Sequence, residues 1–403
     1  MKSKQLLSGP MKAWADDVLA DVALEKAYVF ALLDAETLSL PRHIVEALRG
    51  DEGENCRTLY QNLATPTAIV LNAPDAAAEQ QLRDATAASP CRLKRRCAFN
   101  RCVLLRRTHF EHDDPVALLR RPAIQRLLAL PNRAKLIVLS GRAFALLSPA
   151  QLKALALAPQ TDLLIYLPTH YGAVLPQDYP LLTFLEKHLR RVPERTPVEA
   201  LQTLRKFLQK KIEKNNPSKN IAATKETAAA LKEIAAASKK NTFHFSPFTF
   251  PLYLHAFTLR EADDYHGLLY ATASHSRMEK FLRACWADDP LLGRSNNTAL
   301  ASFAPDSLFF AASAPPASRA DETARRVRRA ILHKQVRTAH AALRFALAEG
   351  CLPRIAAAVV RDLDAEGRLA HTRGFTPRPS LSAPDFQLRL KPRRPASRAR
   401  KKE

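Results

Sequence analysis

Residues 135–168 read KLIVLSGRAFALLSPAQLKALALAPQTDLLIYLP, and the fold follows from this stretch. It opens with an apolar run at 135–140, which predicts a buried strand followed by a loop. Ser148 and Pro149 predict the start of a helix, as an N-cap residue and a proline in the first helical position. The apolar run at 162–167 predicts a second strand. Two apolar strands joined by a helix indicate a βαβ unit with parallel strands.

Strands and helices alternate over about the first 170 residues, which predicts a layered α/β domain. Aromatic-rich runs further along predict an antiparallel pair of strands at the sheet edge, followed by a helix at 277–286. We expect a Rossmann-like parallel sheet with helices on both faces over residues 1–290, with a helical, Lys/Ala-rich insertion near 197–240. The other expected strands are 28–33, 65–72, 102–107, 252–259 and 267–272, with a helix at 115–130.

The C-terminal part has a different pattern. Three helical segments are followed by two short strands around a Pro/Ser-rich loop, which is the order of a winged helix-turn-helix. A small helical dimerisation or capping module is the alternative interpretation. We expect a linker at 291–318, a winged-helix-like domain at 319–391 and a basic disordered tail at 392–403. The expected helices are 321–337, 339–349 and 353–366, and the expected strands are 368–372 and 386–390.

The chain is strongly basic, with 62 Lys and Arg against 39 Asp and Glu and a formal net charge of +23. Such a charge favours a polyanionic partner, most simply DNA or RNA. A generally basic proteome or a ribosome-associated surface would give the same charge. The candidate nucleic-acid-binding residues are Arg92, Lys94, Arg95, Arg96, Arg106 and Arg107 around the strand at 102–107, Arg354 and Arg361 on the third C-terminal helix, and Arg393 and Arg394 in the tail.

Several classes of site are not expected. The chain has only ten glycines and no GxGxxG or GxxxxGK[ST] motif, which argues against glycine-rich phosphate loops. Its six cysteines form no CxxC pair, so no metal site is expected, although Cys91, Cys97 and Cys102 with nearby histidines are an alternative. No apolar run approaches the roughly 20 residues of a membrane helix. We therefore expect a cytoplasmic protein with no membrane contact.

Residues 265–286, YHGLLYATASHSRMEKFLRACW, form an aromatic strand, a turn of small residues with a histidine, and a helix that contains a methionine and ends in a tryptophan. This pattern resembles the closing signature of the three-Cys-motif partner protein family. The stretch at 135–168 resembles a strand, capped helix and strand of the same family, and AEGCLPRIAAAVVRDLDAEGRL at 348–369 resembles its tail. The signature positions are Tyr265, Leu268, Ala271, His275, Met278 and Trp286.

The resemblance implies a class I methyltransferase-type fold that binds S-adenosylmethionine, and a partner that carries a three-cysteine motif and resembles radical-SAM enzymes. The chain departs from the family at two strand ends. Residues 33–37 lack the family's cofactor glycine loop, and residues 140–143 replace its Asp-Pro-aromatic-Gly motif. No cofactor is therefore expected. If S-adenosylmethionine does bind, Asp34, Asn72 and Ser140 are the weak candidates for its site.

Three hypotheses follow from the sequence. The first is a non-catalytic, methyltransferase-like protein that binds nucleic acid and acts with a partner enzyme. The second is an active S-adenosylmethionine-dependent methyltransferase that acts on nucleic acid. The third is a structural subunit that holds a protein partner.

Overall fold

A computed structural model describes residues 14, 26–32, 68–72, 80, 108–111, 115–169, 174–189, 196–213, 252–261, 264–287, 318–370 and 380–391. The chain divides into two compact units. The first comprises residues 1–243 and 251–315, and the second comprises residues 244–250 and 316–403.

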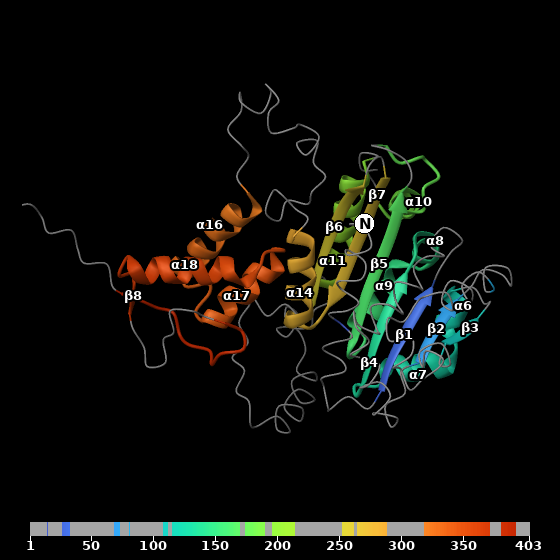
Figure 1. Ribbon diagram of the computed structural model, residues 1–403, viewed down its shortest axis with the longest axis horizontal. Coiled ribbons are helices and arrows are strands. Elements are labelled where there is room, and N and C mark those ends of the chain that lie inside the picture. Colours follow the sequence, from blue (N-terminus) through green and yellow to red (C-terminus); the bar gives the residue numbers. More distant parts are fainter. Residues whose placement is uncertain are drawn as a thin grey trace, which may run out of the picture. The chain divides into compact units, whose positions relative to one another are not determined.

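The first unit is built on a seven-stranded sheet with the order β3-β2-β1-β4-β5-β7-β6 (Figure 1). Strands β1 to β5 are parallel, and β7 runs antiparallel to both of its neighbours. A parallel-rich α/β sheet is therefore confirmed, as is the antiparallel pair at its edge. The strands are β1 (Lys26–Leu32), β2 (Ala68–Asn72), β3 (Thr108–Glu111), β4 (Arg133–Leu139), β5 (Thr161–Thr169), β6 (Tyr253–Glu261) and β7 (Asp264–Thr272).

The βαβ stretch folds largely as its sequence predicts. Strands β4 and β5 pair in parallel, and α9 (Pro149–Leu157) connects them. Ser148 Oγ accepts a hydrogen bond from Gln151 N at 3.2 Å, and Gln151 Oε1 accepts one from Ser148 N at 2.9 Å. This reciprocal pair is a capping box, which satisfies backbone donors at the start of α9.

The loop predicted directly after β4 is wrong, because the chain turns there into a short helix, α8 (Gly141–Leu146). Helix formation at this point buries Phe144 and Leu147 in the core. The helix predicted at 115–130 is also divided, into α6 (Pro115–Arg120) and α7 (Pro122–Ala129). Pro122 supplies no backbone donor for a continuous helix, so it begins a new one. Residues 102–107, the predicted third strand, lie outside the described residues, and β3 follows them.

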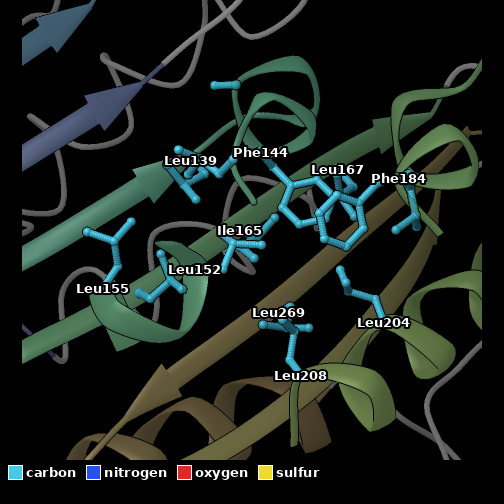
Figure 2. Packing of buried hydrophobic residues seen from close by; sticks show 14 of the residues in the cluster. Leu139, Phe144, Leu152, Leu155, Ile165, Leu167, Phe184, Leu204, Leu208 and Leu269 are labelled. Carbon is cyan, nitrogen blue, oxygen red and sulfur yellow. The ribbon is translucent and has the colours of Figure 1, made fainter. Parts of the chain in front are cut away.

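One face of the sheet holds the main hydrophobic core, which Figure 2 shows from close by. Alternate strand residues point to this face, among them Leu139, Ile165 and Leu269, because side chains alternate along a strand. They pack against α8, α9, α10 (Pro180–His188) and α11 (Pro197–Glu213). Burying each such side chain contributes about 1.5–3 kcal/mol. The helices contribute Phe144, Leu152, Leu155, Phe184, Leu204 and Leu208.

Helix α14 (His275–Ala287) packs against the opposite face of β6 and β7. The intervening residues of β7, Leu268 and Tyr270, are fully buried on this side. The rings of Tyr270 and Phe281 lie 5.0 Å apart between centroids. Helices therefore cover both sides of the sheet, as predicted.

In its described residues, the second unit contains three helices, labelled α16, α17 and α18 in Figure 1, followed by a small antiparallel pair of strands. Thr338, which precedes the second helix, forms an additional β-bridge with Gln387. Gly350 and Gly367 end the second and third helices with positive φ angles of 76° and 66°, which glycine tolerates best. The elements are α16 (Arg319–Leu332), α17 (Ala339–Ala348), α18 (Pro353–Ala365), β8 (Leu369–Ala370) and β9 (Arg389–Leu390).

Among the described residues, no helix is both long enough and apolar enough to cross a membrane.

Candidate nucleic-acid interface

Helix α18 separates its apolar and polar residues onto two sides. Ala356, Val359, Val360 and Leu363 are buried in the core of the second unit, and Pro353 begins the helix. The helical period of 3.6 residues directs the other positions away from this core. We call this side the α18 outer face. It consists of Arg354, Ala358, Arg361, Asp362 and Ala365, all of them exposed or partly exposed.

Arg354 and Arg361 are the two cations of the α18 outer face. They stand seven residues apart, which is close to two helical turns and about 10 Å along the axis. Both side chains are exposed, and within the described part of the chain neither has an ion-pair partner. Their guanidinium groups are therefore available to an external acceptor. The sequence correctly predicted that these two residues belong to one helix.

Two ion pairs connect the three helices of this unit. Arg328 of α16 makes two parallel hydrogen bonds to Glu366 at the end of α18, at 2.8 and 2.5 Å. These bonds lower the pKa of the Glu366 carboxyl group. Arg326, also on α16, pairs with Glu349 at the end of α17 and lies 5.9 Å from the centre of the Phe345 ring. Both pairs are on the surface, where water and salt screen them, so they orient the helices more than they stabilise the fold.

The loop that precedes β9 is attached to the first turn of α17. His340 N donates to Asp385 Oδ1 at 2.9 Å. His340 Nε2 lies 3.0 Å from the carbonyl oxygen of Ser380 and 2.8 Å from that of Ala383. Leu388 N adds a hydrogen bond to Arg337 O at 2.7 Å. The sequence analysis missed this attachment, since its partners are some 40 residues apart and no local pattern links them.

The carboxyl edge of the large sheet is where a parallel α/β sheet holds its ligands. Leu32 aligns with Asn72 on one side and with Leu139 on the other, and Ser140 N donates to Leu32 O at 2.9 Å. The strand ends that carry two of the three cofactor candidates, Asn72 and Ser140, therefore flank β1. The third candidate, Asp34, lies outside the described residues.

Ser140 is poorly placed to hold a cofactor. It is fully buried, and its Oγ has no hydrogen-bond partner in the part of the chain that the structure describes. A Cβ atom on Gly141 would meet only Leu167 Cδ2, at an ordinary 3.7 Å, so no close backbone approach requires glycine here. Ser140 Oγ is therefore enclosed by the protein rather than open to a ligand at this edge.

A buried polar cluster, which the sequence analysis missed, lies at the amino end of β5. Asp162 accepts hydrogen bonds from Tyr270 Oη at 2.5 Å, Thr272 Oγ1 at 2.8 Å and Arg277 Nη1 at 3.1 Å. Burial raises the pKa of Asp162, and the charge of Arg277 opposes that shift. The cluster is buried at the end of β5 opposite to the carboxyl edge, and its hydrogen bonds join β5, β7 and α14.

The remaining predicted site residues fall outside the described part of the chain: Arg92, Lys94, Arg95, Arg96, Arg106, Arg107, Arg393 and Arg394. Among the described residues, no group of three or more His, Cys, Asp or Glu side chains is placed to hold a metal ion. The two described cysteines, Cys285 and Cys351, are buried and form no disulfide within the described part of the chain.

Comparisons with known proteins add no assignment. No protein-family model matches the sequence, and no curated protein matches it significantly. The resemblance to the three-Cys-motif partner proteins thus stays a prediction from the residues.

Proposed function

We propose that this chain is a non-catalytic, methyltransferase-like protein that binds nucleic acid through its C-terminal unit and acts with a partner enzyme. The observation that carries the proposal is the α18 outer face. Two exposed arginines, which have no acidic partner among the described residues, stand on one side of the helix, while its other side is buried in the core. The guanidinium group of arginine binds both phosphates and the edges of bases through paired hydrogen bonds.

The order of elements in the second unit supports a winged helix-turn-helix. Three helices precede the strand pair β8–β9, and the bridge between Thr338 and Gln387 adds a third short strand position. In helix-turn-helix proteins a recognition helix enters the major groove with its N-terminal residues at base edges. In this unit α18 takes that place, with Arg354 in its first turn.

The first unit supports the methyltransferase-type part of the proposal. The order β3-β2-β1-β4-β5, followed by a reversed β7 inserted before β6, agrees with the sheet that the family resemblance implies. The poor fit of Ser140 at the carboxyl edge favours a scaffold over an enzyme. A protein that carries a three-cysteine motif is the proposed partner of this scaffold.

Calorimetry distinguishes this proposal from the two alternatives. Titration of the full chain with S-adenosylmethionine should give no heat. Measurable heat that is lost in Asp34→Ala or Asn72→Ala variants would favour an active methyltransferase instead. Co-purification with a protein partner, in a chain that binds neither the cofactor nor nucleic acid, would favour a structural subunit.

Filter binding of the full chain to duplex DNA and to single-stranded RNA at 50–200 mM salt tests the proposed function. We expect affinity for at least one of them to fall as salt rises, since each neutralised phosphate contributes about −0.7 to −0.9 to the slope of log K against log salt. The double variant Arg354→Ala/Arg361→Ala should bind at least tenfold more weakly. The matched control is Arg283→Ala, on an exposed arginine of α14. Absence of binding, or binding that salt does not change, would refute the proposal.

A further inference from the structure

The exposed side of α18 carries charges of both signs. Arg354 and Arg361 share the outer face with Asp362, and Glu366 lies just beyond the helix end. Arg328 of α16 already occupies Glu366 through its two hydrogen bonds. Asp362 follows Arg361 directly and is exposed, so a phosphate bound there would meet a carboxylate. The α18 outer face therefore carries two cations and one anion, a net charge of +1, so it is not the uniformly cationic surface that suits phosphates alone.

Small residues separate the two arginines. On the outer face, Ala358 lies between the two arginines and Ala365 lies one turn beyond Arg361. Neither alanine has a large side chain that would keep the helix backbone away from a ligand. An α-helix with such a surface fits the B-DNA major groove, which is about 12 Å wide. The deep, narrow major groove of duplex RNA does not admit side chains in this way. The shape of the face therefore favours duplex DNA.

The spacing of the arginines matches the spacing of base pairs. Seven residues of helix rise about 10 Å, and consecutive base pairs are stacked about 3.4 Å apart. Two arginines at this distance therefore reach base pairs about three steps apart. Arginine makes its most common specific contact with the O6 and N7 atoms of guanine, through two parallel hydrogen bonds.

We propose that the α18 outer face reads base edges in the major groove of duplex DNA, with Arg354 and Arg361 each contacting a guanine and the two guanines lying about three base pairs apart. This inference rests on the proposed function and names its substrate class. The carboxylate of Asp362 can only accept hydrogen bonds. It therefore favours a base with an amino group facing it, such as cytosine, over a base whose facing atom is also a hydrogen-bond acceptor.

Selection of bound duplexes from a random-sequence pool, with the full chain, tests the inference. The enriched sequences should share two guanines about three base pairs apart. Arg361→Ala should abolish the preference for one guanine and Arg354→Ala the preference for the other, each lowering affinity for the selected duplex about tenfold to a hundredfold. Arg361→Lys should weaken the preference, because the flexible ammonium group of lysine lacks the rigid planar fork of the guanidinium group. The control Arg325→Ala, on an exposed arginine of α16, should leave the selected sequence unchanged.

The salt dependence of binding separates this inference from the proposed function. A residue that contacts a base leaves the slope of log K against log salt unchanged when it is replaced, whereas loss of a phosphate contact reduces that slope by about 1. Reduced slopes for Arg354→Ala and Arg361→Ala, together with equal losses on all duplexes, would overturn base reading and leave nucleic-acid binding intact. Tighter binding to single-stranded RNA than to any selected duplex would also overturn it. No binding to any nucleic acid would refute the proposed function itself.

Discussion

Lys135 is a buried cation in the middle of an apolar sheet. It is fully buried at the third position of β4, and its Nζ donates to the carbonyl oxygens of Leu128 at 3.2 Å and Leu130 at 2.6 Å. These carbonyls lie at the carboxyl end of α7, where the helix dipole favours a positive charge. Burial nevertheless lowers the pKa of Lys135 from 10.5 to about 8.

Lys135 should make the stability of the first unit depend on pH. Its folded pKa is depressed, so its stabilising contribution is present above pH 10.5 and is lost as pH falls through about 8. The free energy of unfolding of the wild type, relative to that of Lys135→Met, should therefore rise between pH 8 and pH 10.5. Urea unfolding followed by tryptophan fluorescence checks this, since Trp14 and Trp286 both belong to the first unit. Lys210 is exposed, so the difference between the wild type and the control Lys210→Met should stay constant over this pH range. If the difference between the wild type and Lys135→Met is constant as well, the prediction is wrong.

At the scale of elements, the Asp162 cluster is the clearest non-local connection in the sheet. It joins β5 to the end of β7 and to the first turn of α14 through side chains with at most 7% exposure. Asp162→Ala should destabilise the first unit by about 3–5 kcal/mol, because Arg277 keeps a buried charge without its carboxylate. Glu279→Ala, which removes the exposed pair with Arg283, should cost about 0.5 kcal/mol or less. Equal costs in chemical denaturation would contradict a stabilising role for the cluster.

Local signals made some elements predictable and left others hidden. The start of α9 was predictable because Ser148 and Pro149 are neighbours in sequence and typical of the first positions of a helix. The two sides of α18 also follow from local spacing. Arg354 and Arg361 stand seven residues apart and share the exposed side, whereas Val360 and Leu363 stand three residues apart and share the buried side. Helix α8 was missed because the Ser140–Gly141 pair suggested a loop, while the burial of Phe144 decides for a helix.

Partners distant in sequence account for what could not be predicted. Tyr270, Thr272 and Arg277 stand more than 100 residues from Asp162, and no pattern within one segment places them together. The same holds for His340 and Asp385, whose hydrogen bond fixes the loop before β9. At the carboxyl edge, the burial of Ser140 depends on the packing of β1, β4 and α8 together.

At the scale of the whole molecule, a net charge of +23 is combined with a helix, α18, whose outer face presents two arginines and one aspartate. The first feature favours attraction to any nucleic acid, which is long-range and weakened by salt. The second favours selection among sequences at short range. We therefore propose that the overall charge attracts a nucleic acid, whereas Arg354 and Arg361 choose where it binds.

The most direct test of the central claim is protection of arginines from phenylglyoxal, measured residue by residue by mass spectrometry on the full chain. With duplex DNA at saturating concentration, Arg354 and Arg361 should react several-fold more slowly than in the free protein. Arg283, which is 69% exposed on α14 of the other unit, should react at the same rate in both states. Unchanged reactivity of Arg354 and Arg361 while the DNA is bound would contradict recognition through α18.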